Sequence, residues 1–261
     1  MKKIAPGTSC AALLLALSAC ADDGAGDKSY GDPKPASQAE STSAQSAVTG
    51  VSDMRSLSEN DPKDTTAVAR VSGVYGNVNV LTASKQASQL QGGLAAATGG
   101  LLGVMEGALD ESCVQSGGGT VTYDNCDFGT AKMNGTIGFQ DPTLTVDLTI
   151  TVGVSGVASN IDYEGTLEVS ATAIVGTLSF KAASDVSGAA AGAAGGGSFQ
   201  TTTTVDATYD VELTDGCPTG GEVEIHSVSG VSGSGLPSGA GGQDVWVKAL
   251  FGPNCGDVQV Q

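Results

Sequence analysis

Two stretches of this chain alternate strictly between apolar and polar side chains, and this alternation limits the possible folds more than any other feature. Over 144–152 every even-numbered residue is Leu, Val or Ile, and Thr or Asp stands between them. Over 199–213 the last five odd-numbered positions, from 205 to 213, are Val, Ala, Tyr, Val and Leu, and they are separated by Asp, Thr and Glu. Successive side chains of a strand point to opposite faces. Both stretches therefore predict strands of an antiparallel sheet with one apolar and one polar face.

A short pattern that begins with Gly-Thr recurs at four places in the second half of the chain. The segments are GTVTY at 119–123, GTIGF at 135–139, GTLEV at 165–169 and GTLSF at 176–180. Their uneven spacing argues against a solenoid repeat. They are better explained as consecutive strands of one meander, each of which meets a similar environment. The glycine-rich stretches 188–197 and 233–243 then predict loops between strands.

Helical spacing of apolar residues is found before residue 113. The stretch 67–82 fits both a helix and a strand, and we favour a helix that continues into the next stretch. Within 84–112 the apolar positions recur at steps of three and four, which predicts a helix; they are Leu90, Leu94, Ala97, Leu101, Met105 and Ala108. Six glycines weaken this helix, so we expect it to pack on the sheet. Gly99, Gly103 and Gly107 also have the spacing of paired membrane helices, but Glu106 and Asp110 interrupt that pattern.

The expected fold class is α+β or mainly β. About eight to ten antiparallel strands would form one strongly curved meander sheet or incomplete barrel. The N-terminal helix at about 84–112 would pack on its apolar concave face. The β-rich domain as a whole would span residues 67–261.

The first twenty residues have the pattern of an export signal. Lys2 and Lys3 precede an apolar run at 11–17, which is too short to span a bilayer, and small residues follow. The junction Leu17-Ser18-Ala19-Cys20 resembles the lipobox of bacterial lipoproteins. This resemblance implies that residues 1–19 are removed and that Cys20 carries lipid, palmitate included. The alternative is an ordinary secreted protein with an incidental cysteine.

The resemblance to lipoproteins also implies a location. Ala21 stands where lipoproteins of the inner membrane often carry Asp, so the resemblance favours the outer membrane of a bacterial cell envelope. Residues 20–66 are rich in Asp, Ser, Ala, Gly and Pro and poor in large apolar residues. Such composition predicts a flexible tether, because little apolar surface is available to offset the entropy of ordering.

Four cysteines remain after Cys10 leaves with the signal and Cys20 takes the lipid. An even number in an exported chain predicts disulfides. Three pairings exist, and we expect the one that joins neighbours, Cys113 to Cys126 and Cys217 to Cys255. A zinc site is disfavoured because the CxxC spacing is missing and the chain has one histidine. The stretches around these cysteines resemble uncharacterised exported β-rich lipoproteins, a resemblance that implies no activity; they are GGGTVTYDNCDFGTAKMNGTIGF, CPTGGEVEI and FGPNCGDVQV.

The charge balance excludes two classes of partner. The chain has 11 basic and 28 acidic residues, for a formal net charge of −17. A protein that binds nucleic acid needs clustered Lys and Arg for the phosphates, and adhesion to anionic lipid needs basic residues as well. We therefore expect neither nucleic acid as a partner nor an electrostatic contact with membranes.

Candidate chemistry is sparse. His226, the single histidine, follows Glu222 and Glu224 at steps of two, so all three would share one strand face. They would form either a surface metal site or, as we favour, a polar outer face. Asp162 and Glu164 are solvent-facing neighbours, which disfavours the paired carboxylates of glycoside chemistry. The chain has no GxSxG elbow and no GxGxxG turn between strand and helix, so we expect no enzyme, metal or cofactor.

Trp246, the only tryptophan, lies in the alternating stretch around GQDVWVKALFG. It would either stack on a sugar or a partner, or cover an apolar edge of the core. Together these features predict a membrane-anchored envelope lipoprotein with a non-enzymatic structural or partner-binding role. The alternative is a carrier or chaperone for a lipid or other apolar ligand held in the concave sheet. A hydrolase is the least favoured class. A continuous apolar cavity would favour the carrier, and a filled concave face would favour the structural role.

Overall fold

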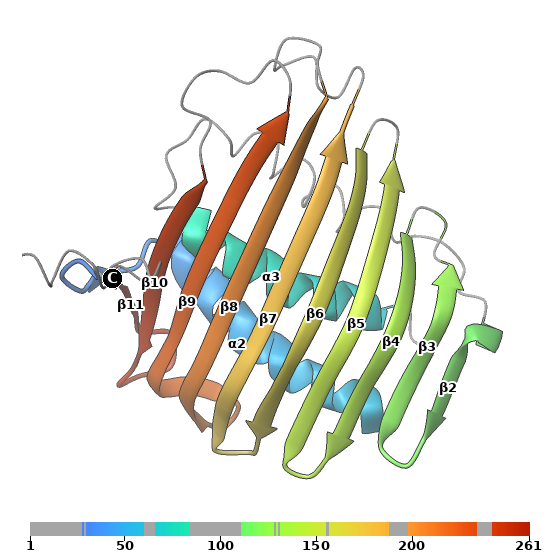
Figure 1. Ribbon diagram of the computed structural model, residues 1–261. Helices are drawn as coiled ribbons and strands as arrows, with labels where there is room; N and C mark the ends of the chain where they lie inside the picture. Colours follow the sequence, from blue (N-terminus) through green and yellow to red (C-terminus); the bar gives the residue numbers. More distant parts are fainter. Residues whose placement is uncertain are drawn as a thin grey trace, which may run out of the picture.

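The computed structural model describes residue 28 and the ranges 30–59, 66–83, 111–127, 129, 131–154, 157–187, 198–233 and 242–261. These residues form an eleven-stranded sheet with two α-helices on one of its faces (Figure 1). The strand order is β1-β11-β10-β9-β8-β7-β6-β5-β4-β3-β2. Each pairing is antiparallel. From β2 to β11, every strand also lies beside the strand that follows it in the sequence. The predicted curved antiparallel meander is confirmed.

The elements have the following bounds. The helices are α2 (Gln38–Glu59), α3 (Thr66–Ala83) and a 3-10 turn, η1 (Glu111–Cys113). The strands are β1 (Lys34–Pro35), β2 (Val114–Gly117), β3 (Thr120–Asp127), β4 (Ala131–Gln140), β5 (Thr143–Val154), β6 (Val157–Val169), β7 (Ala173–Val186), β8 (Phe199–Thr214), β9 (Cys217–Gly233), β10 (Gln243–Phe251) and β11 (Val258–Val260).

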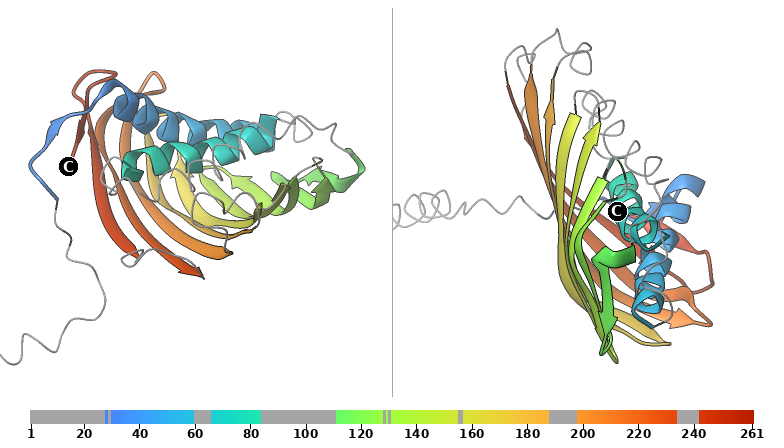
Figure 2. Two further views of the ribbon diagram at one scale, coloured as in Figure 1. Left: turned by 90° about the horizontal axis from the view of Figure 1, so that it is seen from above. Right: turned by 90° about the vertical axis from the view of Figure 1, so that its right-hand side faces the viewer.

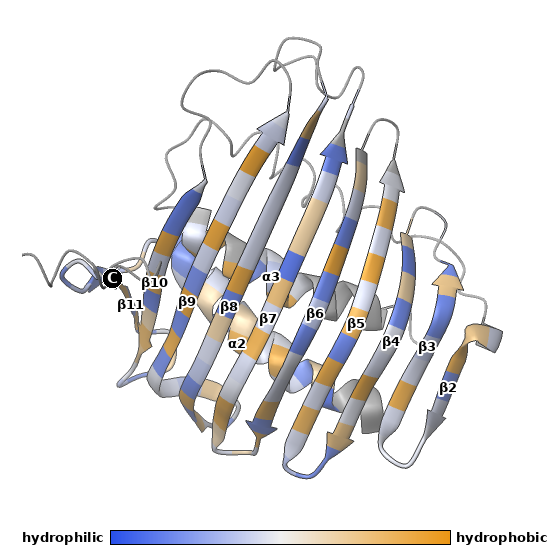
Figure 3. Cartoon of the chain, viewed as in Figure 1, coloured by the Kyte–Doolittle hydropathy of each residue, from blue (hydrophilic) through white to orange (hydrophobic). Residues whose placement is uncertain are grey.

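Apolar and polar residues alternate along the strands (Figure 3), and the burial of their side chains assigns them to the two faces of the sheet. On β5 the side chains of Leu144, Leu148 and Ile150 are at most 1 % exposed, and the hydroxyl and carboxylate residues between them face away from the helices. We call the face that carries α2 and α3 the inner face and the other one the outer face. The sheet curves around the helices, as Figure 2 shows from two further directions.

Glycines on the inner face account for part of this curvature. Gly135 and Gly176 have φ angles of +120° and +139°, which side chains rarely tolerate. A Cβ on Gly135 would collide with the carbonyl oxygen of Asp147, and one on Gly176 with that of Thr166. Glycine at such points lets strands bend and approach closely. In the three Gly-Thr segments that lie within strands, at 135, 165 and 176, the glycine is on the concave face and the threonine on the outer one, whereas Gly119 lies in the turn between β2 and β3.

The helices differ from the sequence-based expectation. The weakly favoured helix over 67–82 is confirmed as α3. The expected flexible tether over 20–66 is wrong for residues 38–59, which form α2. The composition rule failed there because the buried residues of α2 are mostly small; they are Ala44, Ala47, Val48, Val51 and Met54, each at most 1 % exposed. Small side chains bury enough surface when a concave sheet meets them on one side and a second helix on the other.

The single helix expected at about 84–112 lies outside the described residues, except for the short turn η1 at its end. The fold therefore has two helices before that stretch, where one was expected within it. The signal segment 1–19, Cys20 and the glycine-rich 188–197 also lie outside the described part of the chain.

The core lies between the helices and the inner face. Buried side chains from α2, α3 and the strands belong to one hydrophobic cluster. At its centre Tyr75 of α3 packs on the rings of Tyr163 and Phe180, with centroid distances of 6.2 and 5.4 Å. The rings of Tyr163 and Phe180 meet edge to face at 5.2 Å. Such offset contacts between aromatic rings stabilise a core beyond the area they bury.

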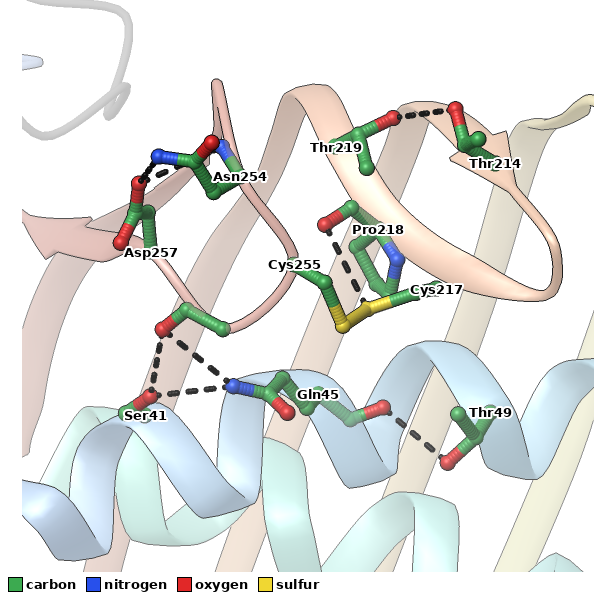
Figure 4. The surroundings of a disulfide bond; sticks show 11 residues. Ser41, Gln45, Thr49, Thr214, Cys217, Pro218, Thr219, Asn254, Cys255 and Asp257 are labelled. Carbon is green, nitrogen blue, oxygen red and sulfur yellow. Dashed lines mark hydrogen bonds between the residues drawn. A yellow bond between two sulfur atoms is a disulfide. The ribbon is translucent and has the colours of Figure 1, made fainter.

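Both predicted disulfides are confirmed. Cys113 at the end of η1 is bonded to Cys126 of β3, and Cys217 at the start of β9 is bonded to Cys255, which follows β10. The second disulfide ties the loop after β10 to the start of β9, close to α2 (Figure 4). There the carbonyl oxygen of Gly256 accepts hydrogen bonds from Ser41 Oγ at 3.4 Å and Gln45 Nε2 at 3.5 Å. The disulfide thus ties this loop to β9, and the hydrogen bonds from Ser41 and Gln45 join the same loop to the helical layer.

Candidate functional site

The densest group of aromatic and charged side chains on the outer face lies on β9 and β10. Adjacent strands pair Trp246 with His226 and Lys248 with Glu224 in register. Ile225 and Val247, which alternate with them, are completely buried in the core. Their neighbours therefore point to the outer face. We call this group, together with Lys28 and Tyr30 that join it from the N-terminal segment, the outer-face cluster; its members are Lys28, Tyr30, Glu222, Glu224, His226, Asp244, Trp246 and Lys248.

The two candidate binding residues, Trp246 and His226, lie against each other. Their rings are stacked, 4.0 Å between centroids and 10° between planes. The imidazole Nε2 is 2.9 Å from a carboxylate oxygen of Asp244, two residues before Trp246 on the same strand. A carboxylate partner of this kind holds an imidazole ring in one orientation. The His226 ring of β9 is therefore held by two residues of β10, Asp244 and Trp246.

The N-terminal segment crosses this surface at Lys28. Its ammonium lies 2.9 Å from Glu224 Oε1 and 4.4 Å from the centroid of the Trp246 ring. The first contact is a charged hydrogen bond and the second is a cation–π contact, which tryptophan makes best among the aromatic residues. Lys28 thus links the N-terminal segment to β9 and β10 at once.

Tyr30 makes a second link two residues further on. The ammonium of Lys248 lies 5.0 Å from the centroid of the Tyr30 ring. The same ammonium is 2.8 Å from Glu222 Oε1 and 3.9 Å from Glu224 Oε2. Lys248 therefore sits between the tyrosine ring and two carboxylates, and the segment that begins at Lys28 is held at two successive points.

The electrostatics of the cluster follow from this arrangement. Burial by itself would raise the pKa of Glu224, but Lys28, the nearby Tyr30 hydroxyl and Lys248 outweigh it and hold that pKa below its usual value. Burial raises the pKa of Tyr30 well above its ordinary value, and Glu224 and Glu222 add to the shift. Glu224 is therefore ionised and Tyr30 neutral over the whole physiological range.

The structure places the residues singled out in the sequence as follows. Glu222, Glu224 and His226 share one strand face, as predicted, but each faces a side chain of opposite or complementary character. Across the described part of the chain, no group of three or more His, Cys, Asp or Glu side chains could hold a metal ion. Trp246 is half-buried, and its ring contacts His226 and Lys28 of its own chain.

Sequence reasoning missed Lys28 and Tyr30, because both fall in the stretch assigned to a tether. One signal was present: Tyr30 is the single aromatic residue between 21 and 66. An isolated aromatic ring beside a lysine in a polar stretch indicates a point of attachment to a folded surface.

The remainder of the outer face is mostly polar, with hydroxyl and acidic side chains, although Val175 and Val228 are also exposed there. Asp162 and Glu164, the pair considered for glycoside chemistry, are both exposed on β6. Asp162 accepts a hydrogen bond from Thr149 Oγ1 of β5 at 2.8 Å, and Asp206 of β8 accepts one from Ser179 Oγ of β7 at 2.6 Å. Such cross-strand pairs stabilise a sheet face that is in contact with water.

Comparison of the chain with models of protein families, with curated proteins and with solved structures found no match. Among the helices that the structure describes, none has the length and apolar character needed to cross a membrane.

Proposed function

We propose that the protein is a lipoprotein of the bacterial cell envelope, anchored by lipid on Cys20, with a non-enzymatic structural or partner-binding role. The observation that carries the proposal is Leu17-Ser18-Ala19-Cys20 directly after the apolar run at 11–17 and the basic Lys2-Lys3. Each buried lipid methylene contributes about 0.8 kcal/mol, and two or more chains on one cysteine give stable anchoring.

The fold supports a structural role over that of a carrier. The concave face of a curved sheet is where an apolar ligand would bind, and here side chains of α2 and α3 pack on it in one cluster with those of the strands. Tyr75, Tyr163 and Phe180 meet at the centre of this cluster. A core packed in this way favours a rigid body that presents its outer surface.

The polar groups of the outer-face cluster support a role without catalysis. A general base or nucleophile must be free to reach a substrate. Glu224 and Glu222 instead pair with Lys28 and Lys248, and the imidazole of His226 is held between Asp244 and Trp246. These contacts serve to hold the N-terminal segment on the sheet.

The test of anchoring uses two cysteines of the same segment. In cells supplied with labelled palmitate, Cys20→Ala should abolish labelling of the protein and release it from the membrane fraction. Cys10→Ala is the matched control, because Cys10 precedes the expected cleavage point, and it should leave both unchanged. Membrane association of Cys20→Ala together with an unlabelled wild type would refute the proposal.

The proposed destination has a separate test. By the resemblance stated above, Ala21 favours the outer membrane and an Asp at that place favours the inner one. We expect the wild type to sediment with the outer membrane in a density gradient and Ala21→Asp to shift towards the inner membrane. Recovery of the wild type with the inner membrane would contradict the outer-membrane assignment and leave the lipid anchor intact.

A further inference from the structure

We infer that the protein turns the outer face of β9 and β10, around Trp246, towards the lipid surface and holds its helical layer away from it. The inference rests on the proposed lipid on Cys20. Its first observation is the position of Lys28, which follows Cys20 by only eight residues and contacts Glu224 and Trp246 on this face.

Only a short length of chain separates Cys20 from Lys28. Eight residues reach at most about 29 Å when fully extended, and a flexible chain of that length has an r.m.s. span of about 14–17 Å. Without the contacts of Lys28 and Tyr30 the chain would first be held at Lys34 of β1, at the edge of the sheet, and a flexible chain of that length has an r.m.s. span of about 19–22 Å. The contacts of Lys28 and Tyr30 thus shorten the tether and move its point of attachment from the edge to the outer face.

The point of attachment is off-centre on the molecule. Eight strand spacings separate β10 from β2 at the far edge, which amounts to about 38 Å at 4.8 Å per strand. The helices α2 and α3 lie on the opposite face of the sheet (Figure 2). To reach the helical side, the chain from Cys20 would have to pass around β11 and β1 at the near edge, so its short span keeps the outer face next to β10 closest to the anchor.

After Lys28 the chain passes around that edge itself. Lys34–Pro35 pairs with β11 at the edge of the sheet, and α2 then lies on the inner face. The segment from Lys28 to Pro35 therefore forms a strap from the outer to the inner face. The force that brings the surface to the membrane is the covalent lipid, since the acidic chain has no electrostatic attraction to anionic lipid. The strap decides which face of the protein lies nearest to the membrane.

Trp246 makes the inference measurable, because it is the only tryptophan in the chain. The lipidated protein, isolated from the envelope, is placed in vesicles of zwitterionic phosphatidylcholine that carry a small fraction of dansyl-labelled lipid. Energy transfer from Trp246 to the dansyl groups then reports its distance from the lipid. The matched reporter is the variant Trp246→Phe/Thr49→Trp, in which Phe keeps an aromatic ring for the cation–π contact of Lys28 and the donor sits at an exposed position on α2.

We expect the transfer efficiency from Trp246 to exceed that from the α2 position about twofold or more, because the face with Trp246 lies within the short span of the anchor. Lys28→Ala/Tyr30→Ala lengthens the free chain, so the same pair of measurements made in that background should give nearly equal efficiencies. Flotation with the vesicles is recorded for every variant.

The outcomes separate the two proposals. Failure of the wild type to float refutes the lipid anchor and the orientation with it. Flotation with equal transfer from both positions, or with higher transfer from α2, refutes the orientation alone. A difference that persists unchanged after Lys28→Ala/Tyr30→Ala shows that the strap does not set the orientation and likewise overturns the inference.

Discussion

Gly176 on β7 offers a direct test of how the sheet obtains its curvature. Its φ angle of +139° lies in a region that is essentially restricted to glycine. In the Gly176→Ala variant the new Cβ would collide with the carbonyl oxygen of Thr166 and come within 2.9 Å of Leu167 Cα, both on the neighbouring strand. These are backbone atoms in the middle of a sheet, so the strands themselves would have to move.

The expected cost has two parts. Forcing a side chain into this backbone conformation costs about 1–3 kcal/mol, and overpacking against the next strand costs about 1–3 kcal/mol more. We therefore expect Gly176→Ala to lower the free energy of unfolding by about 4 kcal/mol. Tyr209 lies opposite Gly176 on β8 and is only 1 % exposed, so this part of the core has little room to adjust.

Gly153→Ala on β5 is the matched control. Gly153 is exposed and has no positive φ, and a Cβ there would meet nothing within 4 Å. Because Ala restricts the unfolded chain more than Gly, this variant should be unchanged or slightly more stable, by at most about 1 kcal/mol. Urea unfolding followed by circular dichroism and by Trp246 fluorescence measures both variants. A difference between them below about 1 kcal/mol would refute the strain argument.

Three more predictions concern the helix, a disulfide and the strap. Met54→Ala should lower the free energy of unfolding by about 2–5 kcal/mol, since Met54 is 1 % exposed in α2. An unchanged midpoint of urea unfolding would contradict the packing of α2 on the sheet. Replacing Cys217 and Cys255 together by Ser should cost about 4 kcal/mol, because the bond closes a loop of 38 residues; stability equal to that of the wild type would contradict this. The pKa of Glu224 is lowered in the folded protein, so its contribution is present above the ordinary value of 4.5 and is lost as pH falls through the lowered value. Proteolysis before Tyr30 should therefore increase in acid, and Glu224→Gln should remove this dependence on pH; an equal acid transition in that variant would exclude Glu224 as its cause.

Much of the sheet could be predicted from the sequence, because the information is local. A strand buried on one face must alternate, and a shift of one residue would turn every apolar side chain outwards. Thr143–Val154 and Phe199–Thr214 are therefore visible as strands without any partner. The disulfides followed from the same logic: in a meander, cysteines close in the sequence lie close in space, and both pairs join such neighbours.

The outer-face cluster was predictable only in part. Alternation placed Glu222, Glu224 and His226 on one face of β9, and it turned Trp246 away from Val245 and Val247 on β10. It could not show that β9 and β10 bring Trp246 beside His226, since that depends on the register between two strands. Nor could it show that Lys28 and Tyr30 return to this surface from almost 200 residues away in the sequence.

Two features depended on the tertiary structure alone. The stretch 38–59 has too few large apolar residues to indicate a buried helix, and its Ala and Val side chains are buried only because the concave sheet and α3 enclose them. The repeated Gly-Thr pattern was visible, but its purpose was not, because the collision that forbids a side chain at Gly135 or Gly176 is with the backbone of another strand. Alternation along the chain is a property of each strand, whereas curvature and the strap arise from contacts between segments that the sequence keeps far apart.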